Sequence, residues 1–107
     1  MPSPEPTPAP AIDDDIDPVV HSPARLKILT VLKEVESAEF LFLLRHTDLT
    51  RGNLSSHLSK LEVTGYVRIT KEFVEKIPRT LIQLTEAGKT ALETYRRQML
   101  QRLERLK

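Results

Sequence analysis

The stretch LTRGNLSSHLSKLEVTGYV, residues 49–67, constrains the fold of this chain most strongly because it predicts a helix with two opposite faces. Leu54, Leu58 and Leu61 recur at i, i+4 and i+7, so Leu58 and Leu61 lie within about 40° of Leu54 around a helix. The other side carries small polar side chains instead of the long charged ones that usually cover a solvated helix. The leucine stripe is therefore expected to dock on a core, while the polar face stays free.

Capping residues mark both ends of this helix. Thr50 can accept a hydrogen bond from the first turn, and Gly65 can take the left-handed conformation that ends a helix. Beyond it, residues 66–71 alternate apolar and polar, and residues 81–84 are apolar with one polar break. We therefore expect two short strands flanking residues 72–79, and a helix followed by a β-hairpin is typical of a winged helix.

Three motifs follow one another in this region: GNLSSHL-x-KLE-x-x-GYV, then K-x-F-x(4)-PRT, then LT-x-x-G. In this order they resemble the winged helix-turn-helix transcriptional regulators related to the MarR and ArsR groups. The resemblance covers residues 20 to about 95. It implies a DNA-binding domain, and a terminal helix that forms dimers.

The residues before this helix predict two more helices of the same core. Ser22 as N-cap and Pro23 at the first helical position open a helix whose apolar face is formed by Leu26, Ile28, Leu29, Leu32 and Val35. Ser37 can cap a second helix over residues 39–47. This second helix is so apolar that we expect it to lie between other elements. The fold class is then mainly α with a small β-hairpin: a three-helix core, a wing and a long C-terminal helix.

The N-terminal region differs in composition from the rest. Five of the eight prolines occupy alternate positions from Pro2 to Pro10, which favours extended, solvated chain. We expect residues 1–17 to be a disordered Pro-rich acidic tail, passive rather than a regulatory arm. Residues 18–84 would then form the DNA-binding core, and residues 85–107 a C-terminal dimerisation helix.

Charge and composition limit the function. The first 20 residues hold five acids and no base, so sixteen bases face the remaining ten acids and residues 21–107 carry about +6. This moderate basic excess suits a polyanionic partner. The chain has no cysteine, and nothing in it resembles a secretory or membrane-spanning segment, so we expect a cytoplasmic protein without a cofactor.

The polar face of the helix and the hairpin supply the candidate DNA contacts. Asparagine can pair with adenine in two places, and serine can donate or accept, so the candidates for reading bases are Asn53, Ser55, Ser56 and Ser59. The candidates for binding phosphate are Thr50, Arg51, Lys60, Arg68, Lys71, Lys76 and Arg79. The alternatives are an ordinary solvated helix face, and cations that only protect a β-edge.

The hairpin departs from the family pattern in one respect. No glycine occurs between Gly65 and Gly88, whereas wing tips are often rich in glycine. Glu72 and Glu75 would also oppose DNA if they pointed toward it. Insertion of this wing into the minor groove is therefore not expected.

The histidines do not predict a metal site. His57 lies at the edge of the leucine stripe, which favours a packing and hydrogen-bonding role over DNA contact. His21, His46 and His57 are far apart and lack a carboxylate at ligand spacing. Catalysis is not expected either, because the chain has no nucleophile turn and no phosphate-binding glycine loop.

The final segment predicts a long helix that begins after Thr85 and spans about 22 residues. Its apolar residues recur at spacings of 3, 4, 4 and 3, and are Leu92, Tyr95, Met99, Leu103 and Leu106. A helix of this length cannot be buried on a small domain, and the simplest partner is its copy in a two-fold dimer. The alternative is a helix folded back on its own core.

These features lead to one functional hypothesis and one alternative. The hypothesis is a homodimeric regulator, most simply a repressor, that binds a pseudo-palindromic promoter site in double-stranded DNA. The alternative is a winged-helix module that binds another protein without sequence-specific DNA binding. Any effector ligand would have to bind at the dimer interface, and the sequence does not name one.

Overall fold

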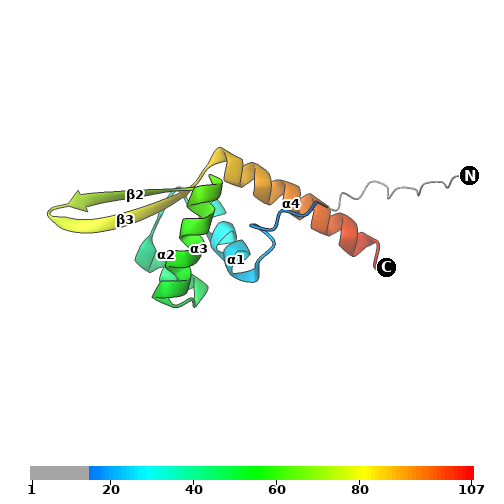
Figure 1. Ribbon diagram of the computed structural model, residues 1–107, viewed down its shortest axis with the longest axis horizontal. Coiled ribbons are helices and arrows are strands. Elements are labelled where there is room, and N and C mark those ends of the chain that lie inside the picture. The colour runs from blue at the N-terminus through cyan, green and yellow to red at the C-terminus, as the bar shows by residue number, and fades with distance from the viewer. Residues whose placement is uncertain (1–14) are drawn as a thin grey trace, which may run out of the picture.

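The computed structural model describes residues 15–107. Its elements in chain order are α1 (Pro23–Lys33), β1 (Ala38–Glu39), α2 (Phe40–Thr47), α3 (Arg51–Thr64), β2 (Val67–Val74), β3 (Ile77–Leu84) and α4 (Glu86–Glu104). The first three helices form a cluster, the β2–β3 hairpin leaves it on one side, and α4 leaves it on the other (Figure 1). This confirms the predicted winged helix-turn-helix.

The leucine stripe of α3 forms the centre of the core, as predicted. Leu54, Leu58 and Leu61 are buried. They belong to one apolar cluster with Ile28, Leu29, Leu32, Leu43 and Ile82, which come from α1, α2 and β3. Burying each such side chain contributes about 1.5–3 kcal/mol, so α3 is held mainly by its inner face.

The predicted helix caps are present. The Thr50 hydroxyl accepts a hydrogen bond from the Asn53 N–H at 3.1 Å, and Gly65 ends α3 with a φ of 90°. Ser22 caps α1 and Thr85 caps α4 in the same way. Each cap satisfies an N–H group that would otherwise lack a partner in the first turn.

The prediction for the second helix is partly wrong. Ser37 is not its cap, since α2 begins at Phe40 and Ala38–Glu39 form the short strand β1, which pairs antiparallel with β3. Nor is α2 enclosed: Leu43 is buried, but Leu41 is 46% exposed. A surface helix of only two turns has one face for the core, so its other apolar residues remain partly exposed.

The three strands form a sheet in the order β1-β3-β2. Pairing of β2 with β3 runs from Val67 opposite Leu84 to Val74 opposite Ile77, so both strands are longer than predicted. Only Glu75 and Lys76 remain for the turn, with φ values of 54° and 70°. A two-residue hairpin turn of type I′ requires two successive positive φ values, and here they occur without glycine.

The long helix α4 has two different halves. Leu92 and Tyr95 are 6% and 9% exposed because they pack on the core of their own chain. The last turns extend beyond the core, and Leu103 and Leu106 are 57% and 79% exposed. No helix among residues 15–107 is long and apolar enough to cross a membrane.

The described chain begins before the predicted boundary at residue 17. Ile16 packs against the core, and the Asp17 carboxylate accepts hydrogen bonds from the Tyr66 hydroxyl and, at 2.8 Å, from the Val19 N–H. The end of the predicted tail is therefore attached to the domain. The proline-rich part of that tail, residues 1–14, lies outside the described residues.

Candidate nucleic-acid interface

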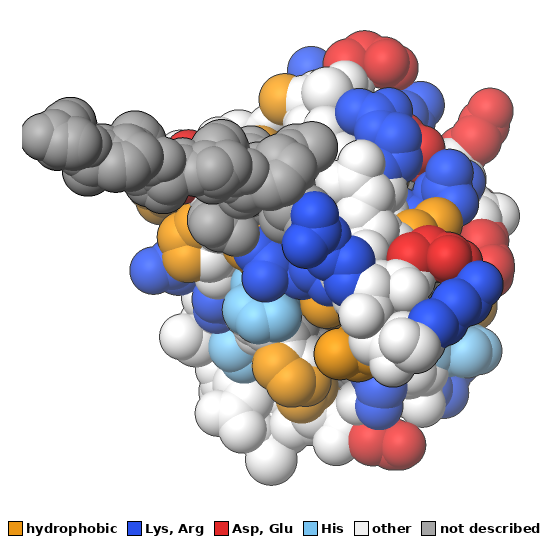
Figure 2. Space-filling model, turned by 90° about the vertical axis from the view of Figure 1, so that its right-hand side faces the viewer, with side chains coloured by type: hydrophobic (Ala, Val, Ile, Leu, Met, Phe, Trp, Pro, Cys, Tyr) orange, Lys and Arg blue, Asp and Glu red, His pale blue; other side chains and the backbone are white. Residues whose placement is uncertain are grey.

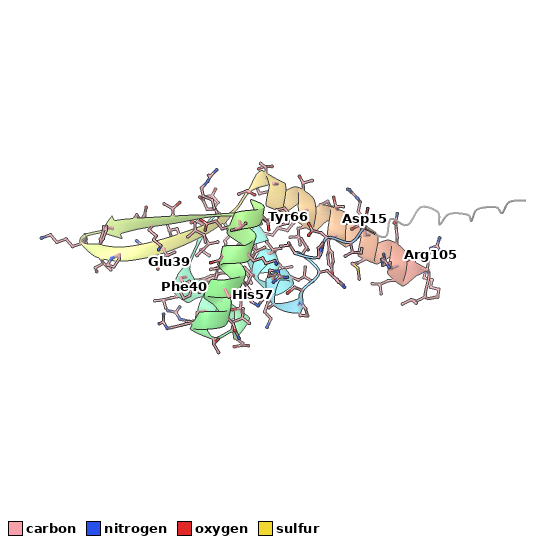
Figure 3. All side chains as sticks on the ribbon, in the orientation of Figure 1. Asp15, Glu39, Phe40, His57, Tyr66 and Arg105 are labelled. Atoms are coloured by element: carbon pink, nitrogen blue, oxygen red, sulfur yellow. The ribbon has the colours of Figure 1, made fainter. Side chains whose placement is uncertain are left out.

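The polar face of α3 is exposed along its whole length. All the candidates at α3 are exposed, namely Thr50, Arg51, Asn53, Ser55, Ser56, Ser59 and Lys60. The helix lies across the front of the three-helix cluster, and no described segment crosses it (Figure 3). Because the leucines behind it fix its position, α3 presents these short side chains on a rigid support.

A groove of about 540 Å³ separates α3 from the base of the hairpin. Ser55, Ser59 and Glu62 line it from α3, and Lys71 and Thr80 line it from the hairpin. The structure thus brings Lys71, predicted from its place in the wing, beside two candidate base contacts. Glu62 was not among the predicted site residues, because a carboxylate on a helix surface is ordinary in sequence.

The hairpin cations do not all lie on one face. Side chains alternate along a strand, so Lys71 shares the face of Val67 and Ile69, which looks toward α3. Arg68 lies on the opposite face, where its cross-strand neighbour is Gln83. Lys71 is therefore placed with α3, whereas Arg68 is not.

Arg79 has a structural partner. Its guanidinium forms an ion pair with Glu39 of β1, and both side chains are about 40% exposed (38% and 41%). Such a half-exposed pair contributes at most about 1 kcal/mol. The pair joins β1 to β3, and contact of Arg79 with phosphate stays a prediction.

His57 has the packing and hydrogen-bonding role predicted for it. Arg25 donates to His57 Nδ1 at 3.1 Å, and the same guanidinium donates to the Val19 carbonyl at 2.7 Å. Burial, and then the nearby Arg25 cation, lower the pKa of His57. Both effects disfavour the protonated form of His57. Through Arg25, the histidine connects the inner edge of α3 to α1 and the N-terminal segment.

Tyr66 has a structural role that was not predicted. It follows the end of α3 (Figure 3). Its hydroxyl donates a hydrogen bond to the Asp17 carboxylate. This hydrogen bond, with burial and the Asp17 charge, raises the pKa of Tyr66 to about 12. Its backbone carbonyl accepts from the Thr85 N–H at 3.0 Å, so the end of α3 is tied to both the N-terminal segment and the start of α4.

The three histidines lie in separate environments. A hydrogen bond of 2.9 Å joins His21 Nδ1 to the Tyr95 hydroxyl, whereas His46 donates to the Phe42 carbonyl. Within residues 15–107, no group of three or more His, Cys, Asp or Glu side chains could hold a metal ion.

The five predicted dimer residues divide between two environments. Leu92 and Tyr95 have little surface left for a partner, and Met99 is half-buried against the core. Leu103 and Leu106 remain exposed. Leu100, which was not among the predicted dimer residues, is 47% exposed. Figure 2 shows Lys and Arg side chains grouped with apolar ones on the side of the molecule where α4 ends.

A comparison with protein families agrees with this geometry. A model of the winged helix DNA-binding domain matches residues 24–103, and the chain belongs to this family. The family is one of DNA-binding domains and not of enzymes, as the sequence predicted. An uncharacterised protein of Methanocaldococcus jannaschii is 37% identical over 83 residues, which cover 78% of this chain and 90% of that protein.

Solved structures with the same fold include transcriptional regulators. A transcriptional regulator homologue from Pyrococcus horikoshii OT3 has a TM-score of 0.79 and 29% identity, over 84% of this chain and 89% of that one. A mutant MarR from E. coli, complexed with operator DNA, has a TM-score of 0.69 over 83% of this chain and 63% of that one. Its identity is 21%, so it shows the fold alone. The MarR resemblance is confirmed at that level.

Proposed function

We propose that this protein is a homodimeric transcriptional regulator that binds a pseudo-palindromic site in double-stranded DNA and, most simply, represses by occupying it. The main support for this proposal is that α3 exposes a face of serine and asparagine side chains while its leucines on the opposite face are buried in the core. Inserted into a major groove, this face would bring Asn53 and Ser56 to base edges. Arg51 and Lys60 at its margins would contact phosphates.

The groove between α3 and the hairpin supports this proposal. Lys71 stands across it from Ser55 and Ser59, so a duplex that receives α3 would meet a cation on its hairpin side. The names of the solved relatives also support it, since the P. horikoshii protein is a transcriptional regulator homologue and the E. coli complex contains operator DNA.

The dimer would form through the last turns of α4. Leu100, Leu103 and Leu106 recur every three residues beyond the point where α4 leaves the core, and all are exposed. Two copies related by a two-fold axis would bury these stripes against each other and place two α3 helices about one helical turn of DNA apart, or a multiple of it.

The decisive experiment is selection of bound fragments from random duplex DNA by the full chain. We expect an enriched motif with two-fold symmetry. If each subunit neutralises about four phosphates, a plot of log affinity against log salt concentration should have a slope of about −7. Asn53→Ala with Ser56→Ala should reduce site preference about 10-fold or more while non-specific binding persists. A chain that binds no duplex at low salt, but loses a protein partner on the same substitutions, is an interaction module instead.

The dimer is tested separately by sedimentation. Leu103→Glu with Leu106→Glu should give monomers and weaken binding to the two-fold site, because the two α3 helices would no longer be linked. Leu41→Glu, at an exposed leucine of α2, is the matched control and should remain dimeric. Monomeric wild-type protein at micromolar concentration would reject the dimer.

A further inference from the structure

The far end of the β2–β3 hairpin carries four exposed apolar side chains: Phe73, Val74, Ile77 and Pro78. Phe73 is 74% exposed and Ile77 is 62% exposed. They form two cross-strand pairs, Phe73 with Pro78 on the face toward α3, and Val74 with Ile77 on the other face. An apolar hairpin end that its own chain leaves uncovered indicates a binding surface or a liability for aggregation.

The position of this end relative to α3 favours DNA as the partner. β2 starts three residues after α3 ends, and seven steps of about 3.3 Å place Val74 about 23 Å from Val67. Half a helical turn of DNA is about 17 Å. With α3 in a major groove, the hairpin is long enough to reach the neighbouring minor groove, and Figure 1 shows it leaving the helix cluster sideways.

The charges near the tip fit the same partner. Lys71 precedes Phe73 on the face toward α3, and Lys76 lies in the turn itself. Both lysines are exposed, and they lie on either side of the apolar pairs along the chain. With the apolar pairs in a groove, the two ammonium groups would be placed to contact the phosphates that line its edges. Insertion into the minor groove was not expected from the sequence, because of Glu72, Glu75 and a hairpin without glycine. In the structure Glu72 lies on the other face, opposite Arg79, so only Glu75 would approach a phosphate. The tight turn also forms without glycine.

We propose that Phe73 and its cross-strand neighbour Pro78 enter the minor groove as an apolar wedge that partly unstacks one base step and bends the duplex. Apolar side chains that architectural proteins insert in this way kink DNA by about 20–90°. Flexible pyrimidine–purine steps are the easiest to deform, so the site should prefer one at the wedge position. This inference rests on the proposed function, because it needs α3 in the adjacent major groove.

The test measures DNA bending by energy transfer between dyes at the two ends of a selected duplex. Wild-type protein should shorten the end-to-end distance, and Phe73→Ala should abolish most of this change and weaken affinity about 10-fold. Since Phe73 lies outside the core, the variant should fold, which its thermal unfolding will show. Leu41→Ala removes an exposed apolar side chain from α2 and is the matched control, with bending and affinity unchanged.

A second variant tests the placement of the tip by charge alone. Glu75→Gln should tighten binding about 2- to 3-fold at low salt, because it removes an acid near a phosphate. Glu36→Gln, at an exposed acid between α1 and β1, should have no effect. Equal responses of the two variants would place the tip away from DNA and overturn the wedge.

The failures of the two proposals can be told apart. A wild-type chain that binds duplex DNA with a preference dependent on Asn53, but leaves it straight, overturns only the wedge. The wedge alone is also overturned if the Phe73→Ala variant binds and bends DNA like wild type. It is likewise overturned if this substitution changes only the self-association of the protein. A chain that binds no duplex overturns both proposals.

Discussion

Helix α3 and the tip of the hairpin both project from the domain, but their exposed surfaces differ in character. The outer face of α3 is polar, and three buried leucines anchor its inner face in the core. The tip carries apolar side chains on both faces, and these are exposed instead of packed on the core. The core therefore fixes where the α3 side chains point, while only the strand ladder and a two-residue turn hold the tip. We therefore expect the tip to be displaced more easily than α3.

Truncation of one apolar residue in each region should give the largest difference between α3 and the tip. Leu58→Ala should lower the free energy of unfolding by about 2–5 kcal/mol, because it opens a cavity behind α3. Phe73→Ala should change it by less than about 0.5 kcal/mol, since its side chain is mostly in solvent. Urea denaturation of both variants measures the difference. Similar losses would mean that the tip is part of the core after all.

A smaller effect is expected where the two regions join α4. A Cβ at Gly88 would overlap the backbone carbonyl of Tyr66 and press on the Leu84 side chain. Gly88→Ala should therefore cost about 1–3 kcal/mol and shift the hairpin relative to α3.

The matched control for that junction is Gly52→Ala, where a Cβ meets nothing within 4 Å. It should stabilise α3 by about 0.5–1 kcal/mol through helix propensity. Thermal unfolding separates the two, and a stable Gly88→Ala protein would show that the junction is loose.

The turn of the hairpin should respond more weakly, and in the stabilising direction. Lys76 adopts a φ of 70°, which glycine takes without steric cost. Lys76→Gly should therefore stabilise the hairpin by about 0.5–1 kcal/mol, measured by amide hydrogen exchange in β2 and β3. Lys71→Gly, within the strand, should weaken it instead. If both weaken it, the turn does not have the conformation described.

The smallest effect is a pH dependence at the inner edge of α3. The folded-state pKa of His57 is lowered from 6.5, so the unfolded chain binds the proton more readily. The contribution of His57 is thus complete above pH 6.5, falls as the pH drops below that value, and is lost below the lowered folded-state pKa. His57→Gln should flatten this part of the stability profile, measured by urea denaturation between about pH 7.5 and pH 5. An unchanged profile would assign the dependence to other groups.

The sequence could not predict several elements whose partners lie far along the chain. Ala38–Glu39 became a strand only because the free edge of β3 was available beside it. The ion pair of Arg79 with Glu39, forty residues earlier, was not predicted, because only the sheet brings the two side chains together. The turn at Glu75 and Lys76 was missed because neither residue is a usual choice for positive φ.

Helix α3 could be predicted from local sequence: its length from the caps at Thr50 and Gly65, its inner face from the leucine spacing, and its polar outer face. These features depend on residues within a few turns of one another, so helical periodicity reveals them. The packing of the whole chain was needed to show which half of α4 stays exposed and which cations of the hairpin lie beside α3. Those outcomes depend on which distant surfaces meet, and local propensity carries no information about that.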